Sequence, residues 1–276
     1  MQHIQSSFKS YDGTELFRQS WLPERSHAAV CLVHGAFEHS SRFENACAAL
    51  ASEGFAVHTF DLRGHGKSTG EITPESSFVE LLKDVRSFVD LLKGEIGEKK
   101  LFMLGQSLGG ALAVLYAADE QAAAGLSGLI LCAPACKLMF PPMSLIIMYT
   151  LSKLFPGLKM KALEAHLVAR DPAVARAYEN DPLVNRQGIP VRPLMEFVKL
   201  IKNGQKEFEK RDLPLLVLHG THDKVTDIRG SRRLSLRSVS TDKTFVEFPN
   251  FYHDLLNDPG KAQVYTCISG WISRRL

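Results

Sequence analysis

A serine at position 107 has a glycine two residues before it and another two residues after it, in the sequence Gly105-Gln106-Ser107-Leu108-Gly109. The apolar run 101–104 precedes this pentapeptide, and the apolar segment 111–116 follows it. The pattern predicts a buried strand, a tight turn and a helix, which is the context of a G-x-S-x-G nucleophile elbow. Glycine is needed on both sides because a Cβ atom would keep the strand and the helix from packing closely. Ser107 is therefore the candidate nucleophile.

A serine hydroxyl needs a base within hydrogen-bond reach at neutral pH, and a third group must orient that base. In a strand–elbow–helix architecture these groups follow in the order serine, acid and histidine, the last two after later strands. The histidines that follow the serine are His166, His219, His222 and His253. Only His253 lies beyond a strand-terminal acid. That acid is Asp223, just after the apolar run 214–219, and Asp227 is the alternative. The expected triad is Ser107, Asp223 and His253.

Attack on a carbonyl group also develops a negative charge on oxygen, which two backbone N–H groups usually stabilise. One should be the N–H of Leu108, because free N–H groups and the helix dipole at a helix N-terminus favour an anion. The other should come from the loop that follows the predicted strand 28–33, where Ala36 is the candidate donor. We therefore expect Ala36 and Leu108 to form an oxyanion hole through their backbones.

The elements that would position these residues alternate between strands and helices. An Asp-Gly pair at 12–13 predicts an opening antiparallel hairpin. Further strands are expected at 28–33, 55–60, 101–104, 126–132, 214–219 and 244–248. Helices are expected from a capping-box sequence at 41–44 to about 52, from a cap at Ser77 over 78–92, over 111–116, and from about 253 to 275. This order favours an α/β fold with a mostly parallel central sheet and helices on both faces.

About eighty residues separate the strands predicted at 126–132 and 214–219, which is too many for a plain crossover. We expect one domain over 1–276 with an inserted hydrophobic cap at 137–192. Residues 138–152 carry no charge, but this run is too short and too interrupted to span a membrane. It is either a buried helix or an apolar lid that contacts substrate tails or a lipid surface.

The composition limits which binding partners and which cellular compartment we expect. Lys and Arg number 33 against 30 Asp and Glu, and the basic residues are scattered, so no nucleic-acid partner is expected. The five cysteines include no CxxC pair, which favours free thiols in a reducing compartment over disulfides or a metal site. Residues 1–7 do not resemble a secretory signal. These features predict a cytoplasmic protein, with peripheral membrane contact if the cap touches lipid.

Five segments taken together resemble the monoacylglycerol lipase and lysophospholipase group of α/β-hydrolases. They are residues 34–43, 61–68, 105–110, 178–183 and 220–226. The resemblance implies a cofactor-independent serine hydrolase that acts on single-chain lipid esters, monoacylglycerols first. Lysophospholipase, short-chain carboxylesterase and thioesterase activities are alternatives on the same triad. A binding member of the fold that has lost catalysis is the alternative outside the enzymes.

The same resemblance implies residues near the alcohol part of the substrate. Glu38, Arg42 and Tyr178 would lie there, or they would brace the loop and the core instead. The chain departs from the pattern of many members at Gln106 and Leu108, which take the places of histidine and methionine, and at Leu256, where some members have a second histidine. These departures are expected close to the alcohol pocket and bear on glycerol preference.

Overall fold

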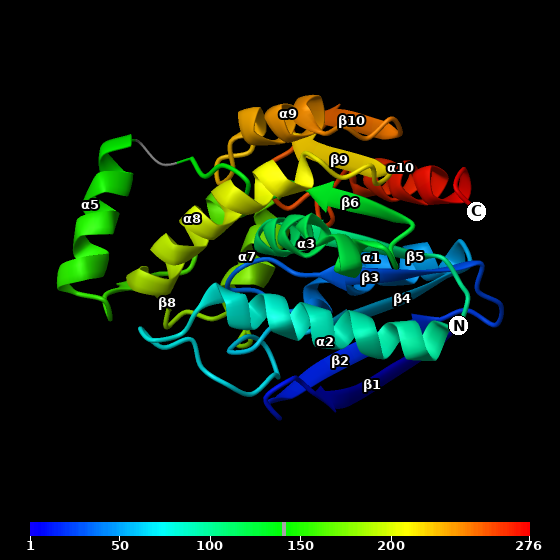
Figure 1. Ribbon diagram of the computed structural model, residues 1–276, viewed down its shortest axis with the longest axis horizontal. Coiled ribbons are helices and arrows are strands. Elements are labelled where there is room, and N and C mark those ends of the chain that lie inside the picture. The colour runs from blue at the N-terminus through cyan, green and yellow to red at the C-terminus, as the bar shows by residue number, and fades with distance from the viewer. Residues whose placement is uncertain (140–141) are drawn as a thin grey trace.

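An eight-stranded sheet runs through the centre of the protein (Figure 1). The computed structural model describes residues 1–139 and 142–276. The strands of this sheet are β1 (Gln2–Lys9), β2 (Glu15–Leu22), β3 (Ala28–Val33), β4 (Phe55–Phe60), β5 (Leu101–Gln106), β6 (Gly128–Cys132), β9 (Leu215–Gly220) and β10 (Lys243–Phe248). Their order across the sheet is β1-β2-β4-β3-β5-β6-β9-β10. A separate antiparallel pair joins β7 (Lys159–Met160) to β8 (Ile189–Pro190).

The sheet is parallel apart from its first two strands. β1 pairs antiparallel with β2, and β2 pairs antiparallel with β4, whereas all pairs from β4 to β10 are parallel. Every residue of β3, β4 and β5 is buried, which is typical of parallel strands covered on both faces. The carboxyl ends of the parallel strands therefore meet at one edge, where open α/β sheets bind their ligands.

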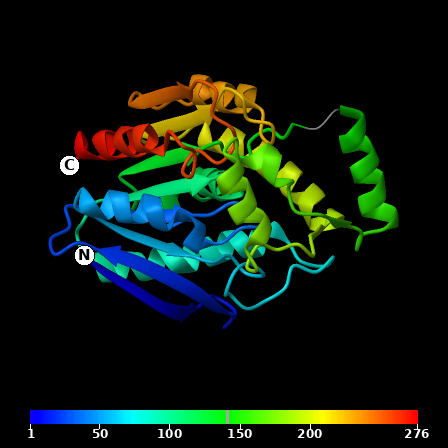
Figure 2. The ribbon, with the colours of Figure 1, turned by 180° about the vertical axis from the view of Figure 1, so that it is seen from behind.

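Helices cover both faces of the sheet (Figures 1 and 2). The helices are α1 (Glu44–Ser52), α2 (Phe78–Ile96), α3 (Leu108–Ala118), α4 (Glu120–Ala123), α5 (Pro142–Leu154), α6 (Ala165–Val168), α7 (Pro172–Asn180), α8 (Val191–Phe208), α9 (Ile228–Arg237) and α10 (Lys261–Ser273). Side chains of α2, α3 and α8 share one hydrophobic core, and those of α1 and α10 share another. Alternate residues of β3 enter the two cores, because successive side chains of a strand point to opposite faces. The predicted layered α/β fold is confirmed.

All five cysteines are unpaired. Cys31, Cys47 and Cys132 are buried in the two cores, and Cys136 and Cys267 are half-buried. Burial raises the pKa of the Cys31 thiol to about 12, so this group stays neutral. The expectation of free thiols is confirmed.

The start of α2 follows the prediction, but the start of α1 does not. The Ser77 side chain accepts a hydrogen bond from the N–H of Val79 and caps α2. A 3₁₀ turn at Ser40–Phe43 precedes α1, which begins only at Glu44 and has no side-chain cap. The predicted capping box is wrong because the Ser41 hydroxyl accepts a hydrogen bond from Gln19 of β2 instead.

The last helix also begins later than predicted, at Lys261 rather than near His253. Pro259 lacks an N–H group and disfavours the helical conformation at Asp258 before it. The Asp258 carboxylate accepts a hydrogen bond from the N–H of Gly260 and holds a turn there. His253 is thereby left in a loop between β10 and α10.

Segment 137–192 lies between β6 and the long helix α8, and its helix α5 stands apart from the sheet in both ribbon views (Figures 1 and 2). Apolar side chains of α5 are exposed, with Met143 at 64%, Ile146 at 59% and Leu154 at 66%. The buried-helix alternative for 138–152 is therefore wrong. Phe140 and Pro141 of that run lie outside the described residues. Among the residues described, no helix is long and apolar enough to cross a membrane.

Candidate active site

Ser107 occupies the turn between β5 and α3, at the carboxyl edge of the sheet. Its backbone has φ 53° and ψ −114°, a conformation that non-glycine residues rarely adopt and that is common at functional sites. A Cβ atom on Gly105 would overlap the carbonyl oxygen of Gly109, and one on Gly109 would overlap that of Val33. The predicted need for glycine on both sides of the serine is confirmed.

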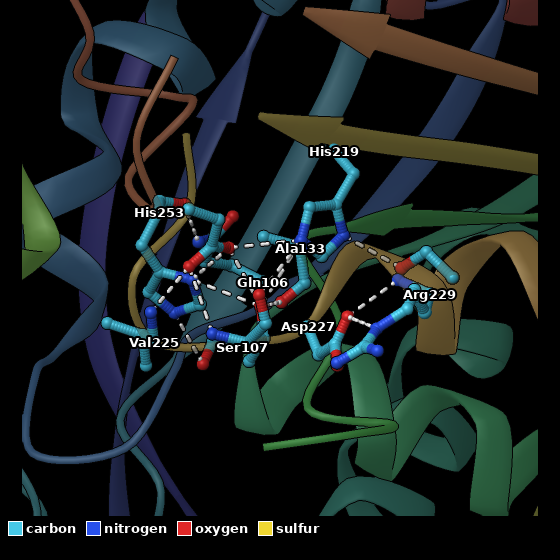
Figure 3. Close-up of polar contacts among 11 residues, drawn as sticks. Gln106, Ser107, Ala133, His219, Val225, Asp227, Arg229 and His253 are labelled. Atoms are coloured by element: carbon cyan, nitrogen blue, oxygen red, sulfur yellow. Dashed lines mark hydrogen bonds and ion pairs between the residues drawn. The ribbon is translucent and has the colours of Figure 1, made fainter. Parts of the chain in front are cut away.

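The structure brings the three predicted triad residues together in one chain of hydrogen bonds. His253 Nε2 lies 2.8 Å from Ser107 Oγ, and His253 Nδ1 lies 2.8 Å from Asp223 Oδ2 (Figure 3). All three residues are buried although they come from the turn after β5, the loop after β9 and the loop after β10. In this arrangement the imidazole can accept the serine proton while the carboxylate holds the ring.

The Asp223 carboxylate is held by several donors besides His253. Its Oδ1 accepts hydrogen bonds from the N–H groups of Val225 (2.7 Å) and Thr226 (2.9 Å), and its Oδ2 accepts one from the Thr226 hydroxyl (2.8 Å). Burial opposes the charged form, but His253 and His219 outweigh it, so the pKa of Asp223 falls below its usual range. Asp223 is therefore ionised and fixed in place.

The alternative acid, Asp227, faces a different set of partners. Its carboxylate contacts Arg229 at 2.6 Å and accepts a hydrogen bond from the Arg229 N–H as the cap of α9 (Figure 3). It also contacts Lys137 at 2.8 Å. Asp227 thus anchors α9, and Asp223 alone of the two contacts His253.

The electrostatics of His253 favour a proton. Burial alone would lower the pKa of this imidazole, but the nearby Asp223 carboxylate outweighs burial and raises the pKa above its usual value. Glu38 and Asp254 act in the same direction. The protonated form of His253 is therefore stabilised.

The two expected oxyanion donors both lie close to Ser107. Leu108 is the first residue of α3, where N–H groups have no acceptor within the helix. Ala36 lies in the turn after β3 and lines the same small cavity as Ser107. The next residue, Phe37, has a φ of 68°, which turns the chain sharply at this point.

That cavity has room for about one water molecule. It is lined by Ala36, Glu38, Gln106, Ser107, Leu163, Val168, Tyr178, His253 and Asp254. Leu163, Val168 and Tyr178 belong to segment 137–192, so this segment closes the site from above the sheet edge.

Glu38, Arg42 and Tyr178 form one buried cluster beside the triad. Glu38 accepts hydrogen bonds from the N–H of Gly35 (2.8 Å) and from Arg42 Nε (3.1 Å). Arg42 also donates to Asp254 at 2.7 Å, and its guanidinium lies 4.8 Å from the centre of the Tyr178 ring. Burial and the Asp254 charge raise the pKa of Glu38, while Arg42 opposes them.

Asp254 is a member of this cluster that the sequence reasoning missed. It is 212 residues from Arg42 along the chain, so only the fold shows the pair. Its position next to His253 was the one available signal.

Gln106 and Leu256, which depart from the family pattern, have different surroundings. The Gln106 amide donates to the carbonyl oxygen of His253 at 3.0 Å, and its Oε1 has no hydrogen-bond partner among the described residues. The Tyr178 hydroxyl in the same cavity also lacks a partner within the described part of the chain. Leu256 packs into the core on the α1 and α10 face and does not line the cavity. Of these two residues, only Gln106 lines the cavity at Ser107.

A parallel sheet with a strand–serine–helix elbow, and with an acid and a histidine on later loops, defines an α/β-hydrolase. The family model described as serine aminopeptidase, S33, matches residues 24–260. The chain belongs to this family and, within it, to the monoacylglycerol lipase group of α/β-hydrolases.

Named relatives support this placement. A monoglyceride lipase from Homo sapiens is 30% identical over 271 residues, covering 96% of this chain and 88% of the relative. A monoacylglycerol lipase from Mycolicibacterium smegmatis is 29% identical over 273 residues, covering 98% and 97%. The crystal structure of a Paleococcus ferrophilus monoacylglycerol lipase superposes with a TM-score of 0.82 at 32% identity, covering 95% and 99%. The chain is a carboxylic ester hydrolase, and the alternative of a non-catalytic binding protein is set aside.

Proposed function

We propose that this enzyme hydrolyses carboxylic esters of single-chain lipids, monoacylglycerols first, through a triad of Ser107, His253 and Asp223. The observation that carries the proposal is the unbroken chain of hydrogen bonds from Ser107 Oγ to Asp223 Oδ2, with 2.8 Å at each step. The relatives named monoacylglycerol and monoglyceride lipases support the choice of substrate.

The reaction proceeds in two halves. Ser107 Oγ attacks the ester carbonyl carbon while His253 Nε2 accepts the hydroxyl proton, and Asp223 stabilises the imidazolium. The N–H groups of Ala36 and Leu108 donate to the oxygen that becomes negative. The intermediate collapses to an acyl-enzyme as His253 gives the proton to the departing alcohol. Water then repeats the sequence and releases the fatty acid.

The alcohol part of the substrate would lie against Glu38, Arg42 and Tyr178. These groups line or adjoin the cavity at Ser107, and the Gln106 Oε1 and Tyr178 hydroxyl there are free of protein partners among the described residues. A buried polar atom without a partner is unfavourable, so a glycerol hydroxyl that bonds to it would gain affinity.

Segment 137–192 would serve as a cap over the acyl channel. The cavity holds about one water molecule, so a lipid enters only when the part of the segment that carries Leu163 and Val168 moves away. The exposed apolar side chains of α5 would touch the lipid surface that supplies the substrate. The five free cysteines are consistent with a reducing cytoplasm. The enzyme would associate peripherally with membranes during catalysis.

A hydrolysis panel tests the proposal. We expect 1-monoacylglycerols to give the highest kcat/KM, compared with lysophosphatidylcholine, short nitrophenyl esters and acyl thioesters. The Ser107→Ala variant should lose about 10⁶-fold in kcat on every substrate and keep the wild-type circular dichroism spectrum. Preference for another member of the panel would reassign the substrate, and full activity of Ser107→Ala would reject the triad.

A further inference from the structure

A second buried histidine, His219, contacts Asp223 together with His253. His219 lies in β9, close to the carboxyl end of the strand, and its side chain is fully buried. Its Nε2 atom is 3.2 Å from Asp223 Oδ2 and 3.3 Å from the carbonyl oxygen of Thr226 (Figure 3). Asp223 Oδ2 therefore faces two imidazole rings, and the reaction scheme uses only one of them.

The contacts of His219 define where its proton is. A carboxylate oxygen and a carbonyl oxygen can only accept, so the Nε2 atom that faces both must carry hydrogen. On the other side of the ring, Nδ1 lies 2.8 Å from the hydroxyl oxygen of Ser231 in α9. Both ring nitrogens are engaged, one by a helix and the other by the acid loop, so the ring is held in one orientation.

We propose that His219 is a positioning residue for ester hydrolysis, which holds Asp223 in the orientation that serves His253. The inference rests on the proposed triad. The His219 N–H lies against both Asp223 Oδ2 and the Thr226 carbonyl, and Thr226 itself binds the carboxylate through its N–H and its hydroxyl. His219 thus braces the acid directly and through the residue that carries two of its donors.

The contact between His219 and Asp223 also changes the negative charge on the carboxylate oxygen that faces His253. A donor on Asp223 Oδ2 withdraws negative charge from the oxygen that faces His253 Nδ1. Without this donor, the carboxylate would stabilise the His253 imidazolium more strongly. The other charged groups that face these rings are Glu38 and Asp254 beside His253, and Glu247 of β10 near His219. A substitution at position 219 leaves Glu38 and Asp254 in place beside His253, whereas Glu247 would lose the charge effect that His219 exerts on its pKa.

His58 offers a matched control in another part of the sheet. It is also a buried strand histidine whose Nδ1 lies 2.8 Å from a serine hydroxyl, that of Ser20. Its neighbours are β2 and β3, far from the acid loop in the strand order. His58→Leu should therefore report the cost of replacing a buried imidazole by an apolar side chain without changing the triad.

The test compares His219→Leu, His219→Gln and His58→Leu on a soluble nitrophenyl ester as a function of pH. Loss of a hydrogen bond to a charged group predicts about tenfold lower kcat for His219→Leu, with KM nearly unchanged. Its acidic limb of kcat/KM should move to higher pH, because His253 holds its proton more tightly. The glutamine side chain of His219→Gln presents an N–H group at a similar place. This variant should therefore restore both the wild-type kcat and the wild-type position of the acidic limb.

His58→Leu should keep the wild-type kcat and pH profile. If His219→Leu does not fold, Ser231→Ala provides the second test, because it leaves the imidazole in place and removes only its partner on α9. Its acidic limb of kcat/KM should move in the same direction by a smaller amount. The inference is overturned if the His219 variants match His58→Leu in kcat and pH profile, or if Gln fails to restore what Leu removes. Activity of Ser107→Ala in the same assay would instead reject the triad itself, so the two failures are distinct.

Discussion

The carboxyl edge of the sheet and segment 137–192 meet at the active site but are built in opposite ways. At the edge, buried polar groups bind one another: Asp223 is 9% exposed and accepts hydrogen bonds from two backbone N–H groups, a hydroxyl and an imidazole. In α5, apolar side chains such as Ile146 stand 59% exposed. A buried carboxylate without its hydrogen-bond donors would be very unfavourable. The polar side chains at the edge are therefore held in one arrangement. Exposed apolar residues impose no such restriction, so α5 is free to meet another apolar surface.

This difference suggests a division of labour. Under the proposed function, the edge would supply a rigid arrangement of nucleophile, base and acid, and segment 137–192 would control access and contact with lipid. The exception is Tyr178, which comes from the segment but is buried against Arg42 of the core. Three sets of substitutions, which affect the two regions differently, test this difference.

The largest effect is expected at the acid. Asp223→Asn should lower kcat roughly 10⁴-fold, because an amide cannot stabilise the imidazolium and favours the wrong tautomer. In the wild type, Asp223 raises the pKa of His253, so kcat/KM falls as the pH drops through that raised value. Removing the charge lowers this pKa, so the acidic limb of Asp223→Asn should move to lower pH. A pH–rate profile measures both changes, and an unmoved limb would contradict the role given to Asp223.

A smaller effect is expected from one added methyl group. Gly109→Ala places a Cβ atom against the Val33 carbonyl and should lower the free energy of unfolding by about 3 kcal/mol. The matched variant in the upper segment is Gly157→Ala, whose Cβ would meet Pro74 at an ordinary 3.5 Å. It should change the stability by less than about 0.5 kcal/mol. Urea unfolding measures the free energy of unfolding of both variants. Equal losses of stability would contradict the view that the sheet edge is closely packed and that segment 137–192 tolerates an added methyl group.

The smallest effect is expected on the exposed apolar side of α5. Replacing Ile146 and Ile147 together by lysine should lower activity on monoacylglycerol dispersions several-fold, since charge weakens contact with an apolar surface. Activity on a soluble nitrophenyl ester should stay at the wild-type level. Leu236 and Val239 are also exposed and lie outside the segment, so their double lysine variant is the control. The comparison fails if both lysine pairs reduce lipid hydrolysis equally.

Local patterns in the chain were sufficient to predict the strands, the elbow and the three residues, Ser107, Asp223 and His253, that lie together at the sheet edge. Buried parallel strands are continuous apolar runs, and glycines on both sides of Ser107 are required by backbone contacts only a few residues apart. The acid and the histidine follow from strand order, because each catalytic group sits at the end of a strand. Features set by neighbouring residues can be recognised in the sequence. The two errors at helix starts arose because the Ser41 hydroxyl bonds to Gln19 of β2 and because a turn at Asp258 and Gly260 precedes α10.

Contacts between distant residues required the folded chain. His219 is absent from the predicted site because its place beside Asp223 depends on the path of the acid loop and on Ser231 of α9. The same holds for Asp254, whose partner Arg42 is more than two hundred residues away. The exposure of α5 is also visible only in the structure. An apolar sequence has the same composition whether or not another element packs over it. Sequence spacing encodes local backbone geometry, whereas burial and side-chain pairing depend on which segments the fold brings together.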